Sequence, residues 1–267
     1  MTFNIALFGD QNPSGCAIHF KEWSQAILDL CKKENIVPDY LSLKLLNGKS
    51  SNLKLSTFIN KLAKLENKEI NYLDISKSES DFSYISIDWE LSTSIVRKKH
   101  FDRIYFGFNS EKLKSTYLEK FNIILNLLRF IEVDYGFCFH MDLKSGPGLY
   151  AADMIATSAE NILTKFDKES MALWSNYQPK AFQAVKTGKL KYLYEFNIIN
   201  NFHLKRHVFG KRLEDWITSS SVNGSLHPLK DNLFLWSIET AQLDWLFELL
   251  MDQNIFLLDR NLKPNFE

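Results

Sequence analysis

The sequence predicts a mixed α+β protein in which helices pack on a mixed sheet, followed by a more helical C-terminal half that ends in a hairpin and a helix. Hydrophobic residues make up 45% of the 267 residues and charged residues 24%, as in an ordinary globular chain. Short apolar runs bounded by glycine, asparagine, serine and proline indicate strands. Segments with an apolar residue at every third or fourth position indicate helices.

The N-terminal half, residues 1–145, carries most of the predicted strands. An apolar run at 3–8 stops at Gly9 and Asp10, which indicates a buried strand that ends in a loop. Phe20, Trp23 and Ile27 then recur with helical spacing, so a helix follows. The same reasoning predicts strands at 40–45, 70–75, 82–91, 104–108 and 135–143, with helices near 56–65 and 112–132.

The C-terminal half, residues 146–267, opens at Gly146-Pro147-Gly148 and is mostly helical. Helices are expected near 154–166, 169–185, 213–218 and 242–251, with hairpin strands at 225–229 and 233–238 and a last strand at 255–258. Residues 196–202 fit a strand or a helix. A chain of this length forms one large domain or two small ones, and we expect two halves that share one compact body.

The charge balance and the cysteines define the expected surroundings of the protein. Lys plus Arg number 32 and Asp plus Glu 32, so the chain lacks the basic excess typical of nucleic-acid binding. Three widely spaced cysteines without a C-x-x-C pair favour a reducing compartment over a disulfide framework or a zinc site. Because the N-terminus has no signal-peptide pattern and no run of about 18 apolar residues occurs, we predict a cytoplasmic protein without a membrane span.

One local basic cluster precedes Glu214 and Asp215, and we interpret it as a solvated helix face. Its members are Lys205, Arg206, His207, Lys211 and Arg212. His203 and His207 would share a face of a helix, but two ligands beside two cations are too few for a metal ion. We therefore predict no metal and no cofactor.

The sequence contains no nucleophile elbow, phosphate-binding loop or zinc-protease motif, so we assign no catalytic residue. One alternative is a metal-dependent nuclease or another phosphodiester-processing enzyme, in which acidic side chains hold Mg²⁺ over a phosphate. Two pairs of its candidate residues lie two positions apart on predicted strands, and so share a face. The candidates are Asp10, Asp88, Glu90, His140 and Asp142.

Aromatic residues are unusually frequent, with 21 Phe, 10 Tyr and 6 Trp. Most belong in the core, but four interleave with polar residues in a segment of poor periodicity: Trp174, Tyr177, Tyr192 and Tyr194. Aromatic residues with a polar rim are typical anchors of a protein interface, although aromatic residues packed under a loop explain the pattern equally. If the segment is an interface, Trp174 and Tyr177 should be exposed in the isolated chain.

Several blocks of sequence carry a resemblance to known proteins. They are residues 194–204, 213–217, 224–226 and 233–238, together with the helix predicted at 117–132 and the run 135–139 that follows it. These blocks resemble bacterial immunity-protein families of polymorphic toxin and type VI secretion systems. The resemblance implies an α+β fold and a non-catalytic protein that binds a cognate toxin. We therefore predict a bacterial, intracellular protein-binding factor, with a protein rather than a nucleic acid as its partner.

Overall fold

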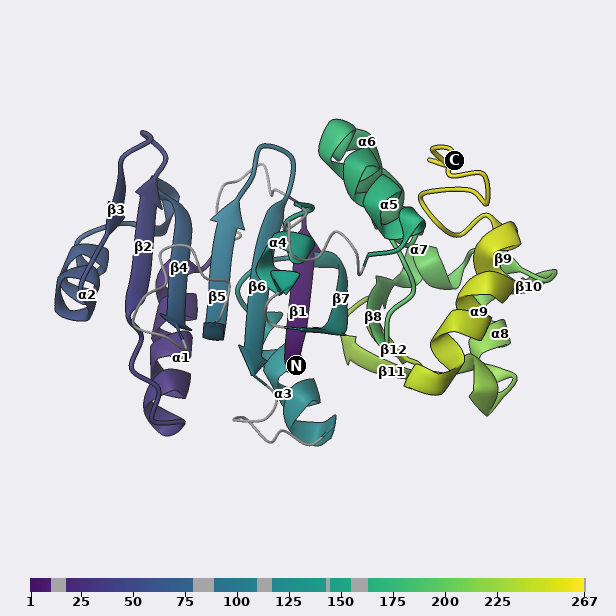
Figure 1. Cartoon of the computed structure of the whole chain (residues 1–267), viewed down its shortest axis with the longest axis horizontal. Helices are drawn as coiled ribbons and strands as arrows, with labels where there is room; N and C mark the ends of the chain where they lie inside the picture. Colours follow the sequence, from purple (N-terminus) through teal and green to yellow (C-terminus); the bar gives the residue numbers. More distant parts are fainter. Residues whose placement is uncertain (11–17, 79–88, 110–116, 143–144, 155–162, 267) are drawn as a thin grey trace. The chain divides into compact units, whose positions relative to one another are not determined.

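A computed structural model describes residues 1–10, 18–78, 89–109, 117–142, 145–154 and 163–266. These ranges contain antiparallel strands together with helices, so the predicted α+β class is confirmed (Figure 1). The chain divides into two compact units, the first formed by Met1–Val133 and His140–Ala151, the second by Asp134–Phe139 and Ala152–Glu267. The sequence predicts a division after residue 145. In the structure the division follows Ala151, and the strand segment Asp134–Phe139 belongs to the second unit.

The first unit contains a sheet of antiparallel neighbours. Its strand order is β1 (Thr2–Gly9), β6 (Asp102–Asn109), β5 (Trp89–Arg97), β4 (Ile70–Ser78), β2 (Tyr40–Leu45) and β3 (Ser50–Asn52). The helices of this unit are α1 (Phe20–Lys33), α2 (Leu55–Ala63), α3 (Tyr117–Leu127) and α4 (Pro147–Ala151), with a 3₁₀ turn at Asn67–Glu69.

One face of this sheet is apolar because its strands alternate with period two. Residues such as Phe3, Ile5 and Leu7 of β1 are fully buried on that face. Helices α1 and α3 lie on it, since the Arg97 guanidinium of β5 sits 5.8 Å from the ring centre of Phe20 in α1 and Lys120 Nζ of α3 sits 4.6 Å from that of Phe3.

The opposite face of the sheet is polar. Paired residues of neighbouring antiparallel strands share a face, and one such row runs through Ser42, Asp74, Ser94 and Tyr105. Helix α4 packs across β6 and β1 on this side (Figure 1), where Gly148 approaches the Tyr105 ring. Gly107 is required here because a Cβ would lie 2.3 Å from Tyr105 Oη, which donates to Asn4 Oδ1.

Two strands of the first unit differ from the sequence prediction. The strand expected at 82–91 begins at Trp89 and continues to Arg97, while residues 82–88 lie outside the described ranges. Ser92 and Ser94 alternate with Leu91, Thr93 and Ile95, so this extension follows the period-two pattern and the prediction stopped too early. Strand β3 was not predicted, because its three residues, Ser50–Asn52, are all polar.

The second unit contains a sheet in the order β11 (Ser225–Lys230), β12 (Leu233–Ser237), β8 (Phe196–Asn200) and β7 (Val133–Met141), of which 134–139 belong to this unit. Its helices are α5 (Lys165–Asn176), α6 (Gln178–Lys186), α7 (Asn201–Leu204), α8 (Leu213–Thr218) and α9 (Leu243–Leu250). A separate small hairpin joins β9 (His207–Val208) to β10 (Lys211–Arg212). The predicted hairpin near 225–238 and the helix after it are confirmed.

Helix caps and a proline explain where the helices begin and end in two segments of this unit. Residues 196–202 form a strand and then a helix, since the Asn200 side chain accepts hydrogen bonds from the Phe202 and His203 amides and caps α7. The helical run expected at 169–185 breaks at Tyr177, and Pro179 follows in the first turn of α6. The last predicted strand, 255–258, forms isolated bridges such as Leu190 with Phe256.

Candidate functional site

Four of the five candidate residues of the nuclease alternative lie in the first unit, and Asp88 lies outside the described residues. Asp10 follows Gly9 at one end of β1, whereas Thr2 at the other end donates a 2.9 Å hydrogen bond to the Met141 carbonyl beside Asp142. At about 3.3 Å per residue, the eight residues of β1 separate Asp10 from Asp142 by roughly 25 Å. Those two carboxylates cannot share one coordination sphere.

Glu90 lies nearer to the other two candidates but on a different strand. It precedes Leu91, which pairs with Phe108, and Phe108 pairs with Phe3 of β1. His140 packs against the Phe3 ring, with Nε2 3.4 Å from Lys120 Nζ, a cation that disfavours a divalent metal at this histidine. Across the described ranges, no three His, Cys, Asp or Glu side chains are grouped so that they could hold a metal ion.

The polar face of the first unit gathers titratable groups that the sequence did not mark. Asp74 accepts hydrogen bonds of 2.6 Å from both Tyr72 Oη and Ser76 Oγ. Burial raises the pKa of the Asp74 carboxyl to about 6, although both hydroxyl donors oppose that shift. Burial also raises the pKa of Tyr105, which is hydrogen-bonded to Asn4. Each of these groups has its own hydrogen-bond partner on this face, Asp74 with Tyr72 and Ser76, and Tyr105 with Asn4.

The raised pKa of Asp74 predicts a specific pH dependence of stability. The folded chain binds the Asp74 proton more tightly than the unfolded chain, so the stabilisation is greatest below the unfolded pKa and is lost as the pH rises through about 6. We measure the free energy of unfolding in urea for Asp74→Asn and for wild type. We expect the value of the variant to rise by roughly 2–3 kcal/mol relative to that of wild type as the pH increases from about 4 to about 7. The exposed Asp231→Asn is the control, and an unchanged difference between Asp74→Asn and wild type would contradict the assignment.

The four aromatic residues expected at an interface divide between interior and surface of the second unit. Trp174 is fully buried and Tyr194 nearly so, stacked 4.2 Å from the Phe137 ring. Tyr192 is half-buried against Phe247, and Tyr177 alone of the four is 48% exposed. Trp174 therefore does not meet the exposure that an interface in this segment would require, whereas Tyr177 does. The place of Trp174 on the inner stripe of α5, with Phe166, Ser170, Met171 and Leu173, is the physical reason.

Two lysines of the same segment are also interior. Lys191 Nζ forms an ion pair with Asp153, and both side chains are nearly inaccessible at 2% and 4% exposure. The Lys191 ammonium lies 5.5 Å from the Phe137 ring centre and 5.8 Å from that of Trp174, so aromatic faces surround the pair. Lys189 is fully buried and donates to the Asn254 carbonyl and side chain at 2.9 and 2.8 Å.

His203 is a buried structural residue of the same unit. Its Nε2 lies 3.0 Å from the Lys189 carbonyl oxygen, and its Nδ1 lies 2.9 Å from the Asn200 side-chain oxygen and 3.2 Å from the Asn200 backbone nitrogen. Burial lowers the pKa of His203 to about 3. His207 lies outside α7 in β9 and is exposed, so the two histidines do not share a helix face.

The hairpin formed by β9 and β10, by contrast, exposes aromatic and basic side chains to solvent. Phe209 and Gly210 form the two-residue turn between β9 and β10, with φ of 51° and 76°. Phe209 is 44% exposed, and its ring centre lies 5.8 Å from that of Trp216. We call the exposed residues around this turn the basic hairpin surface, which consists of Lys205, His207, Phe209, Lys211 and Arg212.

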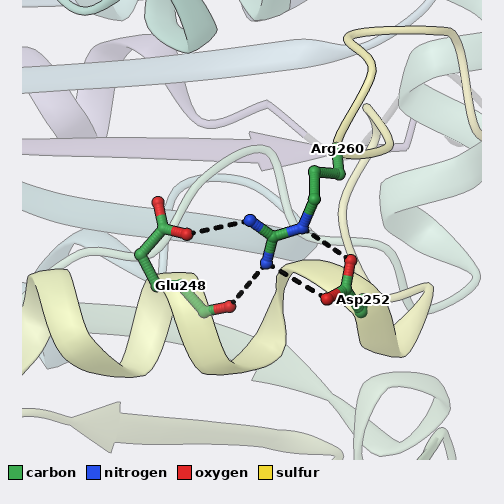
Figure 2. A network of polar contacts seen from close by, with 3 residues as sticks. All are labelled: Glu248, Asp252 and Arg260. Atoms are coloured by element: carbon green, nitrogen blue, oxygen red, sulfur yellow. Dashed lines mark hydrogen bonds and ion pairs between the residues drawn. The ribbon is translucent and has the colours of Figure 1, made fainter.

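A polar clip holds the segment that contacts this hairpin. Figure 2 shows the Arg260 guanidinium between Glu248 and Asp252, with Nε 2.7 Å from Asp252 Oδ1 and Nη1 3.0 Å from Glu248 Oε2. The same guanidinium donates through Nη2 to the Glu248 carbonyl at 3.1 Å. Gln253 follows Asp252 directly, and its side-chain oxygen accepts a 2.7 Å hydrogen bond from the Phe209 amide. The clip therefore fixes the residue that supports the turn.

Comparisons with known proteins give structural matches without sequence matches. No family model matches the chain, and no curated protein matches it in sequence. Among solved structures, the Pseudomonas aeruginosa T6SS protein PA0821 is similar over 93% of this chain and 75% of its own, with a TM-score of 0.58 and 10% identity. At that identity the likeness shows a shared fold alone.

A second solved structure is the toxic C-terminal tip of CdiA from Pseudomonas aeruginosa in complex with immune protein. It covers 52% of this chain and 86% of its own, at 7% identity and a TM-score of 0.25, which does not indicate a shared fold. None of the described helices is long and apolar enough to cross a bilayer.

Proposed function

We propose that this chain is a non-catalytic, intracellular binding factor of the immunity type, which neutralises a cognate toxin by forming a complex with it. The observation that carries the proposal is the likeness of nearly the whole chain to a protein described as part of a T6SS. The sequence blocks that resemble immunity-protein families support the same class.

The state of the reactive side chains in the second unit also favours binding over catalysis. Lys191 is paired with Asp153, Lys189 is held by Asn254, and His203 is a neutral ring within the interior. Groups that are enclosed and hydrogen-bonded in this way stabilise a fold but do not reach a substrate. The exposed groups of the same unit include an aromatic ring with cations around it, which is the composition of an interface.

Growth of a bacterial host tests this proposal. The protein encoded beside the gene for this chain is expressed from an inducible promoter, with and without the chain. We expect growth arrest without the chain and restored colony formation with it, together with co-purification of the two proteins. Arrest that persists while the chain is soluble and abundant would refute the immunity role. An unrelated chain expressed at the same level is the control for reduced toxin synthesis.

A further inference from the structure

We infer that the basic hairpin surface is the docking face of this chain, and that its partner is an acidic protein surface with an apolar recess for the Phe209 ring. This inference rests on the proposed function, because it names the chemistry of the partner that an immunity-type protein would bind. It goes beyond the aromatic segment around Trp174, whose largest ring is enclosed in the core.

The backbone at Phe209 is the first observation that supports the inference. A turn with positive φ at both central residues favours glycine or asparagine at each position, and a bulky side chain there is strained. Gly210 meets this requirement, whereas Phe209 adopts φ of 51° with a large ring and leaves 44% of its surface in water. Because a strained and exposed aromatic residue gives the fold little in return, we assign the ring to recognition.

Charge supplies the second observation. Residues 202–216 contain four Lys or Arg and only two acidic residues, in a chain whose formal net charge is zero. Glu214 pairs with Arg212 at 3.0 Å, which leaves Lys205 and Lys211 as the exposed lysines of the surface. Gln253 contacts the hairpin, and the nearby carboxylates of Glu248 and Asp252 form ion pairs with Arg260 (Figure 2). The hairpin itself therefore attracts acidic groups.

The support beneath the turn is the third observation. The Phe209 amide is held by Gln253, and its ring leans on Trp216, which in turn packs edge-to-face on the buried Trp236 at 6.4 Å. A preformed anchor loses less conformational freedom on binding than a mobile side chain does. This geometry suits a protein recess. A nucleic acid would instead use successive stacked bases along a positively charged groove.

The affinity of the purified chain for the neighbour-encoded toxin tests the inference. Lys205→Glu/Lys211→Glu reverses the charge of the two exposed lysines, and Phe209→Gly removes the ring while relieving the strained φ. We expect each variant to weaken binding at least about tenfold, with the effect of charge reversal shrinking as salt rises from about 0.05 M to about 0.5 M. Both variants should keep the thermal unfolding midpoint of wild type to within a few degrees.

Matched variants on another exposed face complete the design. Lys165→Glu/Lys180→Glu changes the net charge equally, and Tyr177→Ala removes a ring of similar exposure on the α5–α6 side. Wild-type binding that survives both hairpin variants but is lost in these controls would overturn the inference and leave the proposed function intact. Absence of binding by wild type would overturn both. Hairpin variants that lose only affinity for a labelled single-stranded DNA would show a nucleic-acid surface and also overturn it.

Discussion

Replacing Lys191 with methionine is expected to lower the free energy of unfolding by about 3–5 kcal/mol. The substitution keeps an apolar stem of similar length between the rings of Phe137 and Trp174. It removes the ammonium that pairs with the Asp153 carboxylate, a group that is only 4% exposed. Removing one member of a buried ion pair is destabilising, because water does not replace the lost solvation of the charge that stays. Equilibrium unfolding in urea measures the loss.

The matching double variant separates the charge effect from packing. Asp153 has φ of 61°, and Asn tolerates that conformation, so Asp153→Asn removes the charge without a new backbone strain. Alone it should also be destabilising by about 3–5 kcal/mol, because the Lys191 ammonium stays buried. Combined with Lys191→Met it should recover most of the loss, since both members of the ion pair are then uncharged. Losses that simply add in the double variant would contradict the account of the pair.

Replacing Trp174 with alanine is expected to destabilise the chain by about 3–5 kcal/mol, because the ring is fully enclosed and its removal leaves a cavity. Tyr177→Ala, three residues later, should change stability by only about 0.5 kcal/mol. The Tyr177 ring is 48% exposed and lies 6.1 Å from Phe266. Thermal and urea unfolding of the two variants measure this contrast. A small loss for Trp174→Ala would show that the ring is not part of the core.

The contrast between these two aromatic residues shows what the sequence could predict. Phe166, Ser170, Leu173 and Trp174 follow helical spacing, so the sequence contains the stripe that buries Trp174, although polar residues stand between its members. Tyr177 falls off that stripe because α5 ends at Asn176 and the chain turns before α6.

Other features had no sequence signal. Lys189 and Lys191 alternate with apolar residues as solvent-facing lysines of an edge strand would, but tertiary contacts enclose them, among them those with Asn254 and Asp153. The hydrogen bond between Tyr105 and Asn4 depends on the register between β6 and β1, two strands that are distant in sequence. The strand at 3–8 and the hairpin near 225–238 were predictable, because local alternation and turn residues specify them.

The sequence predicts the basic residues of the basic hairpin surface but not its backbone conformation. Its basic residues stood out as a cluster, but the prediction of a helix face was wrong, because Phe209 and Gly210 make a tight turn between two short strands. Gly210 lies between Phe209 and Lys211 and indicates a turn, although the basic residues around it suggested one continuous helix face.

The stoichiometry of toxin neutralisation tests the central claim of a non-catalytic binding protein most directly. The purified chain is titrated into a fixed amount of the neighbour-encoded toxin, and the residual activity of the toxin is measured after mixing and again after prolonged incubation. The account predicts a linear fall that ends at equimolar chain, a residual activity that does not change with time, and recovery of intact toxin from the complex after denaturation. Progressive inactivation by substoichiometric chain, with a chemically altered toxin, would show turnover and contradict it.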